Sequence, residues 1–569
     1  MSILEFVGVS LSPAFNPATF TYTGAAASNV DSVTFSATSA GGQATVTFDG
    51  VALGTGTVTK TVDLDYGANP FVINVTSGDG TTTSTYTITV VRDEGPRLSD
   101  LVLSEGVMSP VFDPLVSTYD VAVGGLIPSL TITPSAGLAA VNITVAGASV
   151  ASGQASAPLQ LVPGLNEIVV RVSTLQGEVR EYALAITRAL VEEGTIYNEN
   201  FADFGRAVAI DGDTAVVGGF GERVHVYVRN GATWTLQQVL NASTTGFDGR
   251  DVAISGDTIV VGASLSSVVW AAVVYTRSGV TWTEQTTIQG TLGFGISVAI
   301  DGDTLVVGNL NEEASIFTRD GATWTQRAVV TASNMQLNDY FGGYPGTIAL
   351  HGGTLAIGAY SEAGSSTGVN GASNENASRS GAVYVFTGSG STWSQQAYIK
   401  ASNTGANDLF GTSVALHQNT LVVGAAEEDS SSTGVNSTPD DASNESGAAY
   451  VFTRSNGVWS QQAYLKAFNT DSFDYFGVSV AVSGETIVVG AWGEQTGAAG
   501  INPIPDNDGT FRGAAYVFRR NGTSWSQQAF VKASDTMNGR SSYFGDTVAL
   551  SGATFVVGAL NGRAAYIYR

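Results

Sequence analysis

Short runs of alternating apolar and polar residues recur along the whole chain, with turn residues between them. In residues 71–91, FVINVTSGDGTTTSTYTITVV, apolar positions alternate with polar ones on both sides of Gly78-Asp79-Gly80. A period of two residues is typical of strands that bury one face, and Gly-Asp-Gly favours a hairpin turn. The pattern therefore predicts an all-β chain built largely from antiparallel hairpins.

In the C-terminal two-thirds, the pattern repeats as a unit of four short strands. Residues 380–424 read SGAVYVFTGSGSTWSQQAYIKASNTGANDLFGTSVALHQNTLVVG, and similar text returns 66 residues later and again, more loosely, at 512–558. One such unit cannot bury its own apolar faces. The repeat therefore predicts a closed ring or a stack of small sheets.

Seven copies of this unit can be recognised, each opened by a Phe-Gly dyad or a degenerate form of it. The dyads are Phe204-Gly205, Phe247 with Gly249, Phe294-Gly295, Phe341-Gly342, Phe410-Gly411, Phe476-Gly477 and Phe544-Gly545. The first six units carry a tryptophan in their fourth strand: Trp234, Trp282, Trp324, Trp393, Trp459 and Trp525. The seventh reaches Arg569 after its third strand, and residues 190–197 can supply a fourth. We predict a seven-bladed β-propeller over residues 190–569, closed by this N-terminal strand.

The repeats resemble the FG-GAP repeats of the integrin α-subunit type of seven-bladed propeller, in the variety common in bacterial exported proteins. The resemblance rests on the Phe-Gly dyads and covers about residues 196–569. Integrin blades often carry an Asp-x-Asp-x-Asp-Gly calcium loop between their first two strands. Here that connection is a tight turn such as Ser255-Gly256-Asp257, so those calcium sites do not carry over.

The residues ahead of the propeller contain two copies of another unit. Four residues of the first copy recur 97 residues later in the second: Pro13, Phe15, Pro17 and Tyr22 correspond to Pro110, Phe112, Pro114 and Tyr119. We predict two small antiparallel β-sandwiches, at residues 1–93 and 97–189. They resemble the cadherin-like β-sandwich domains of bacterial surface proteins, which implies spacers or carriers without chemistry of their own.

Composition narrows the classes of function. The chain has 49 acidic and 24 basic residues, a net charge of −25 and a pI near 4.3, which argues against nucleic acid as a partner. It has no cysteine, which excludes disulfides and thiolate chemistry. No apolar run is long enough for a transmembrane helix. The N-terminus MSILEFVGVS is not typical of a signal peptide, and we expect the chain to belong to a longer exported protein.

Three long connections mark a candidate binding face. In blades four, five and six the connection between the second and third strands is 22 residues long, at Tyr360–Gly381, Ala426–Gly447 and Trp492–Gly513. Alternate connections of an up-and-down blade emerge on opposite faces, so these three loops should share one face, where function is usually placed. The candidate ligand-binding residues are Tyr360, Glu362, Asn370, Glu428, Asn436, Asp440, Trp492, Glu494, Asn502 and Phe511.

Oxygen-bearing side chains in the same loops also predict calcium. The candidate ligands are Glu428, Asp440, Asp441, Asp506 and Asp508, and the text Asp506-Asn507-Asp508-Gly509 is typical of a tight calcium turn. The structural alternative is that Asn and Asp close Asx turns. Lys400, Lys466 and Lys532 share one register position near these loops, and we expect them to pair with acidic loop residues.

No catalytic constellation is readable in the sequence. His351 and His417 fall in tight turns away from the face with the long loops, and His225 falls in a third strand. The repeated Trp-x-x-Gln and Phe-Gly features favour packing between blades. We therefore predict a non-enzymatic extracellular or bacterial cell-surface module that binds a glycan or protein, assisted by calcium. The alternatives are a polysaccharide-active hydrolase or lyase with its site over the channel, and a purely structural segment of a surface fibre.

Overall fold

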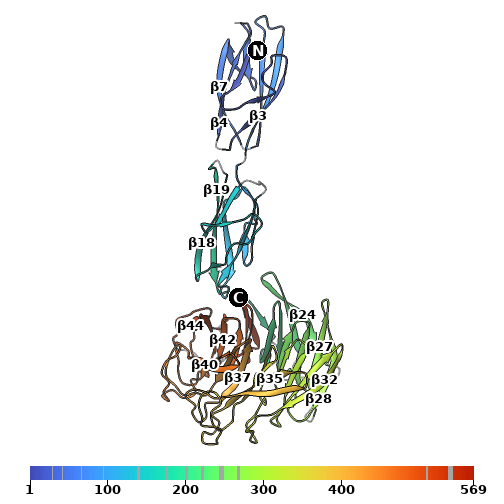
Figure 1. The fold of residues 1–569 in the computed structure, drawn as a ribbon, viewed down its shortest axis with the longest axis vertical. Coiled ribbons are helices and arrows are strands. Elements are labelled where there is room, and N and C mark those ends of the chain that lie inside the picture. The colour runs from blue at the N-terminus through green and yellow to red at the C-terminus, as the bar shows by residue number, and fades with distance from the viewer. Residues whose placement is uncertain are drawn as a thin grey trace. The chain divides into compact units, whose positions relative to one another are not determined.

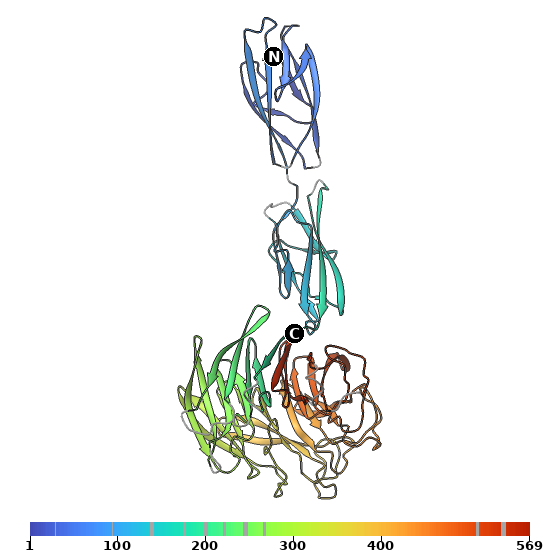
Figure 2. The same ribbon diagram turned by 180° about the vertical axis from the view of Figure 1, so that it is seen from behind.

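The computed structural model describes residues 1–569 with the exception of 29, 42, 66, 94, 137–140, 175–176, 199–202, 220–222, 243–248, 266–268, 508–510 and 536–541. They divide into two compact units, Met1–Ala189 and Leu190–Arg569, drawn in Figures 1 and 2. The described part of the chain is built from strands and turns, and it has no helix long and apolar enough to cross a bilayer. The predicted all-β class is confirmed.

The first unit holds two β-sandwiches. The strands of the first are β1 (Ile3–Phe6), β2 (Leu11–Ser12), β3 (Thr21–Ala26), β4 (Ser32–Thr38), β5 (Thr45–Phe48), β6 (Val51–Thr55), β7 (Thr57–Asp63), β8 (Gly67–Thr76) and β9 (Thr83–Arg92). Those of the second are β10 (Leu98–Leu103), β11 (Val107–Ser109), β12 (Thr118–Gly124), β13 (Ser129–Leu130), β14 (Ile132–Ala136), β15 (Val141–Val145), β16 (Ala148–Val150), β17 (Leu159–Gln160), β18 (Gly164–Thr174) and β19 (Val179–Ala189).

Each sandwich has one large sheet, and the strand order of that sheet is the same in both. The six-stranded sheets run β2-β3-β9-β8-β5-β6 and β11-β12-β19-β18-β15-β16. One pair in each, β3 with β9 and β12 with β19, is parallel, which departs from the purely antiparallel pairing expected from sequence. The repeated tyrosines are packing residues, because the Tyr22 and Tyr119 hydroxyls each donate a 2.6 Å hydrogen bond to a carbonyl six residues upstream.

The second unit is a propeller of four-stranded sheets, seven of them among the described residues. The first three sheets consist of β21 (Ala207–Asp211), β22 (Thr214–Gly218), β23 (Val224–Asn230) and β24 (Thr233–Leu240); β25 (Asp251–Ser255), β26 (Thr258–Ser264), β27 (Trp270–Ser278) and β28 (Thr281–Gly290); and β29 (Val298–Asp301), β30 (Thr304–Gly308), β31 (Ala314–Asp320) and β32 (Thr323–Val330).

The next three sheets carry the long connections. They consist of β33 (Ile348–His351), β34 (Thr354–Ala359), β35 (Ala382–Ser389) and β36 (Thr392–Ile399); β37 (Phe410–His417), β38 (Thr420–Ala425), β39 (Ala448–Ser455) and β40 (Val458–Leu465); and β41 (Ser479–Ser483), β42 (Thr486–Ala491), β43 (Ala514–Asn521) and β44 (Ser524–Val531). The last sheet runs β20 (Glu192–Tyr197), β47 (Ala564–Tyr568), β46 (Thr554–Ala559) and β45 (Phe544–Ser551).

The last sheet joins the two ends of the propeller sequence. β20 pairs antiparallel with β47, so that Thr195 lies opposite Tyr566. In the same region a Cβ on Gly558 would lie 2.0 Å from the carbonyl oxygen of Gly205. Blades seven and one therefore approach as closely as blades five and six, where a Cβ on Gly424 would lie 1.8 Å from the Gly477 oxygen.

The repeated aromatic residues hold neighbouring blades together. Phe410 is fully buried in a cluster that draws on blades four and five. On the outer strands, Trp459 Nε1 donates to Gln396 Oε1 of the preceding blade at 2.9 Å, and Trp525 Nε1 donates to Gln462 Oε1 at 2.7 Å. The structural interpretation of the Phe-Gly and Trp-x-x-Gln features is confirmed at these positions.

Candidate functional site: the face of the long loops

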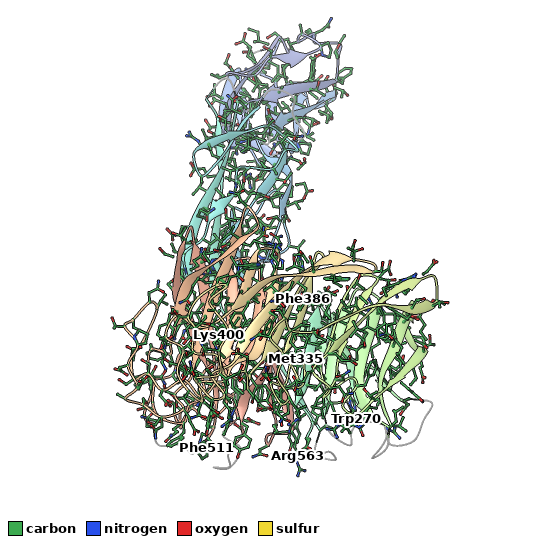
Figure 3. The ribbon with its side chains drawn as sticks, turned by 60° about the horizontal axis from the view of Figure 1, so that its bottom comes forward. Trp270, Met335, Phe386, Lys400, Phe511 and Arg563 are labelled. Atoms are coloured by element: carbon green, nitrogen blue, oxygen red, sulfur yellow. The ribbon has the colours of Figure 1, made fainter. Side chains whose placement is uncertain are left out.

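The three long loops form one continuous arc. Each loop ends by pairing with the first strand of the next blade, as the bridges Gly381 to Phe410, Gly447 to Phe476 and Gly513 to Phe544 demonstrate. Figure 3 labels Phe511 in the long loop of blade six, Arg563 in the corresponding connection of blade seven and Trp270 at the start of β27, and all three lie along the same edge of the propeller. The prediction that these connections share a face is confirmed for the loops of blades four to six.

A buried ion pair lies at the base of each long loop. Lys400 Nζ lies 2.8 Å from Glu362 Oε2, and Lys466 Nζ lies 3.0 Å from Glu428 Oε2. Lys532 pairs with Glu494 in the same way. The side chains are at most 3% exposed, and burial lowers the pKa of each lysine while its glutamate opposes that shift. The predicted pairing of these lysines with acidic loop residues is confirmed.

The second oxygen of each glutamate is also occupied. Glu428 Oε1 accepts hydrogen bonds from the Tyr464 hydroxyl at 2.8 Å and from Asn403 Nδ2 at 2.8 Å. Glu362 Oε1 has the same kinds of partner, Tyr398 at 2.7 Å and Asn334 at 3.2 Å.

The expectation that the three glutamates face a ligand therefore needs correction. Glu362, Glu428 and Glu494 point into the protein, where each carboxylate holds a lysine in place of a ligand or a metal ion. Their shared register position reflects this internal role, because a carboxylate that pairs with a buried ammonium must itself be buried.

Blade six achieves the same network with different residues. Phe530 stands where the other two blades have Tyr398 and Tyr464, so it has no hydroxyl to offer Glu494. The Thr496 hydroxyl donates to Glu494 Oε1 instead. Asn469 Nδ2 donates to the same oxygen at 2.9 Å, as its counterparts do in blades four and five.

The registered asparagines fasten each loop to the fourth strand. Asn370 adopts a φ of 56°, and its Oδ1 accepts a 2.9 Å hydrogen bond from the Tyr398 backbone N–H. Asn436 and Asn502 repeat this contact with Tyr464 and Phe530 at 2.9 and 2.8 Å. The amide oxygen thus accepts a hydrogen bond from the fourth strand as a backbone carbonyl would. These asparagines therefore have the structural role that the sequence analysis gave as the alternative to ligand binding.

The registered aspartates close turns inside the loops. Asp440 Oδ1 accepts from the Ser431 N–H at 2.7 Å, and Asp506 Oδ1 accepts from the Gly497 N–H at 2.6 Å. These hydrogen bonds lower the pKa of the Asp440 carboxyl. Asp441 is exposed next to Asp440.

Within the described ranges, no group of three or more His, Asp and Glu side chains is placed to hold a metal ion. Asp508 lies outside the described residues. Calcium binding therefore stays a prediction.

Aromatic residues distinguish the loops from one another. The first loop residue is Tyr360 in blade four, Ala426 in blade five and Trp492 in blade six. Tyr360 stacks on Tyr340 with ring centroids 5.1 Å apart, and Trp492 stacks on Tyr475 at 4.3 Å.

The aromatic cluster of blade six extends over a neighbouring loop and the next blade. Phe511, which is 37% exposed, and Tyr543 lie 5.7 and 4.9 Å from Trp492. Sequence reasoning missed the tyrosines that precede the Phe-Gly dyads. The sequence signal that could have revealed them is their shared position directly before the dyad. In the structure, Tyr340, Tyr475 and Tyr543 all have a positive φ there, between 51° and 58°.

Buried aspartates near the ion pairs were also missed. Asp339, Asp408 and Asp474 lie two residues before the Phe of the Phe-Gly dyad, and each is at most 6% exposed. Burial raises their pKa values to about 6, about 7 and about 8. Their backbone contacts, such as the 2.8 Å hydrogen bond from the Asp471 N–H to Asp474, only partly offset that shift.

Comparison with known families agrees with this architecture. Residues 5–93 and 98–189 match the cadherin-like β-sandwich domain, and residues 324–386, 393–452 and 459–518 match the FG-GAP repeat. The chain carries cadherin-like domains and FG-GAP repeats. The matched repeats contain the long loops of blades four to six, so the candidate face is built on FG-GAP repeats.

Individual relatives cover small parts of the chain or resemble its overall fold distantly. A "Putative membrane protein" of Evansella cellulosilytica is 30% identical over 97 residues, which are 17% of this chain and 15% of that protein. The computationally designed Ika8 protein has a TM-score of 0.38 at 13% identity, covering 66% of this chain and 98% of its own. YCF48 bound to D1 peptide has a TM-score of 0.38 at 10% identity, covering 66% of this chain and 94% of its own.

Proposed function

We propose that this chain is a non-enzymatic extracellular binding module whose propeller binds a glycan or protein through the loops of blades four to six. The observation that carries the proposal is a contrast within those loops. The ion pairs and asparagine contacts repeat from blade to blade, whereas the first loop residue changes from a half-buried Tyr360 to a buried Ala426 to a half-buried Trp492. A constant scaffold with variable aromatic side chains is typical of recognition surfaces.

The chemistry of the variable positions supports a binding role. Trp492 and Tyr475 are half-buried and stack on each other, Phe511 is the exposed member of the cluster, and such rings contribute large contact area at low entropic cost. Cadherin-like and FG-GAP domains and the partial match to a protein named as a membrane protein support a location at the cell surface or outside the cell.

Binding to arrayed glycans and to extracellular proteins, with and without a chelator, tests the proposal. Trp492→Ala should reduce binding at least about tenfold, because a central aromatic contact typically carries that share of the binding energy. The matched control is Val458→Ala, an exposed apolar residue, 68% exposed, at the opposite end of blade five. Equal binding by wild type and Trp492→Ala would contradict the proposal.

The calcium prediction has its own test. Calcium that binds the folded state raises the unfolding temperature, and the rise grows with the logarithm of the ratio of its concentration to its dissociation constant. We expect a shift at millimolar calcium that Asp506→Asn together with Asp508→Asn removes. The absence of any shift would rule out calcium assistance but leave the loop proposal standing.

A further inference from the structure

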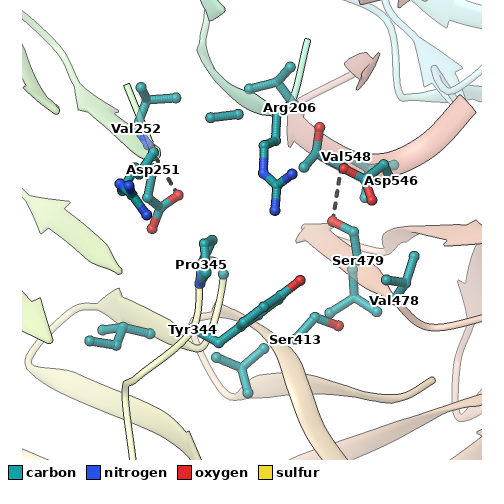
Figure 4. A pocket seen from close by; sticks show the side chains of 18 of the residues that line it. Arg206, Asp251, Val252, Tyr344, Pro345, Ser413, Val478, Ser479, Asp546 and Val548 are labelled. Atoms are coloured by element: carbon teal, nitrogen blue, oxygen red, sulfur yellow. Dashed lines mark hydrogen bonds between the residues drawn. The ribbon is translucent and has the colours of Figure 1, made fainter. Parts of the chain in front are cut away.

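A second candidate site lies at the centre of the propeller. A cavity of about 190 Å³ is enclosed by the first strands of the blades, at the end where the Phe-Gly dyads stand. Its polar side chains include Arg206 and Arg250 from blades one and two, Tyr344 from blade four and Asp546 from blade seven. Figure 4 shows the Arg206 guanidinium pointing into the cavity, between Asp251 and Asp546 and above the ring of Tyr344.

The two carboxylates of the cavity differ in their surroundings. Asp251 is engaged by the protein, because its two oxygens accept hydrogen bonds from the Val252 N–H at 3.0 Å and the Val298 N–H at 2.9 Å. Asp546 lies near Arg206, and burial raises its pKa to about 6 against the opposing effect of that guanidinium. Asp546 is therefore an acceptor at neutral pH that lies beside a strong cationic donor.

Tyr344 reaches the cavity through an insertion that blade five lacks. Three residues lie between Phe410 and Val414, whereas the equivalent stretch of blade four, from Phe341 to Ile348, contains six, with Gly343-Tyr344-Pro345 as the extra residues. Tyr344 is 40% exposed, and it contacts Tyr360 of the long loop edge to face at 5.8 Å. The insertion thus places an accessible aromatic ring opposite the guanidinium.

We propose that this cavity binds a single acidic monosaccharide unit of the hexuronic acid class. The Arg206 guanidinium pairs with the sugar carboxylate, Asp546 accepts hydrogen bonds from ring hydroxyls, and the face of Tyr344 stacks on the C–H face of the ring. The volume of about 190 Å³ leaves room inside the cavity for one small ring. Arg206 and Arg250 are the two cationic side chains of the lining, and they offer an anionic group local donors that the rest of this acidic protein rarely provides.

The proposal does not depend on the long loops, and binding to the full chain tests it directly. Titration with D-glucuronate at neutral pH, followed by calorimetry, should give saturable one-site binding, and D-glucose should bind at least about tenfold more weakly because it cannot pair with Arg206. Arg206→Ala should weaken glucuronate binding by a similar factor, and Arg206→Lys should restore part of it. Tyr344→Ala, in an exposed insertion, should weaken glucuronate and glucose alike.

Arg327→Ala is the control, because Arg327 is an exposed arginine on the outer strand of blade three. It should leave glucuronate binding unchanged. The proposal is overturned if glucose binds as well as glucuronate, or if Arg206→Ala and Tyr344→Ala, folded by their unfolding temperatures, bind glucuronate like wild type. Acetate binding as tightly as glucuronate would also overturn it, since the cavity would then recognise an anion without the sugar.

Discussion

Blades one to three each have an ion pair with an exposed carboxylate, which blade six repeats between Arg520 and Glu485, and blades four to six add a buried pair. In the first three blades Arg229 pairs with Asp213, Arg277 with Asp257 and Arg319 with Asp303, and these aspartates are 62 to 70% exposed. In the next three blades the lysines and glutamates are 0 to 3% exposed. Exposed pairs contribute little to stability, whereas an interrupted buried pair leaves an uncompensated charge in the protein.

The difference corresponds to what each pair holds in place. The exposed pairs flank tight turns, which form without help from a distant charge. The buried pairs fix the base of loops that have few strand contacts of their own. The contribution of an ion pair to stability therefore depends on where the pair lies in the fold, and its presence in the sequence does not reveal that contribution.

Interrupting a buried pair should have the largest effect. Lys466→Met leaves Glu428 buried without its cation, and we expect a loss of about 3–5 kcal/mol in the free energy of unfolding. Asp257→Ala, which removes an exposed pair, should cost less than about 1 kcal/mol. Urea unfolding of the full chain measures both.

A double variant separates charge burial from lost packing. Lys466→Met with Glu428→Gln keeps an oxygen acceptor for Tyr464 and Asn403 but leaves no charge, so it should be more stable than Lys466→Met alone. Equal losses for Lys466→Met and Asp257→Ala would abolish the distinction between the two halves.

The buried aspartates should make the stability of blades four to six depend on pH. Burial raises the pKa of Asp474 to about 8, well above the value near 4 of an unfolded chain. The folded state therefore binds the proton more tightly, and the stability gained is full below about pH 4 and is lost as pH rises through 8. Asp408 and Asp339, with values of about 7 and about 6, act in the same direction.

Asp474→Asn checks this dependence. It should stabilise the protein by about 1–3 kcal/mol at pH 8, where it removes a buried charge, and should flatten the fall in unfolding temperature between about pH 5 and pH 8. Asp303→Asn, at an exposed aspartate, is the control and should leave the profile unchanged. A wild-type stability that rises with pH across this range would contradict the burial argument.

The smallest expected effect compares blade six with its neighbours. Thr496→Ala removes the hydroxyl that replaces a tyrosine at Glu494, and we expect a loss of about 1 kcal/mol. Adding Phe530→Tyr should recover the loss, because blades four and five use a tyrosine at that position. Thermal unfolding of the single and double variants decides whether the two donors are interchangeable.

The sequence predicted the architecture well because its signals are local and repeated. The Phe-Gly dyads mark the first strands, the tryptophans mark the fourth, and the third strand that ends at Tyr568 indicates that the last sheet borrows β20. The parallel pairs of the sandwiches escaped, because alternation reveals which face a strand buries and says nothing about the direction of its neighbour.

The candidate site was harder to predict for a physical reason. Glu362, Glu428 and Glu494 occupy the same position in three loops of equal length, which indicated a shared role. A loop, however, lacks the regular alternation that distinguishes inward from outward side chains in a strand. The lysines at the same period were the better clue, because a cation repeated beside a carboxylate favours internal pairing. Of the cavity residues, Arg206 recurs only as Arg250 of blade two and Tyr344 lies in an insertion, and only the closed ring brings them together.

Hydrogen exchange of the long loops tests most directly the claim that the buried ion pairs hold these loops in one ordered conformation. The backbone amides of Gly381, Gly447 and Gly513 each donate to the carbonyl of a buried glutamate, at 2.8 to 2.9 Å. We predict that these amides and their neighbours exchange almost as slowly as the adjoining strands in wild type and much faster in Lys466→Met for the loop of blade five. Fast exchange throughout 426–447 in the wild-type protein would contradict the account.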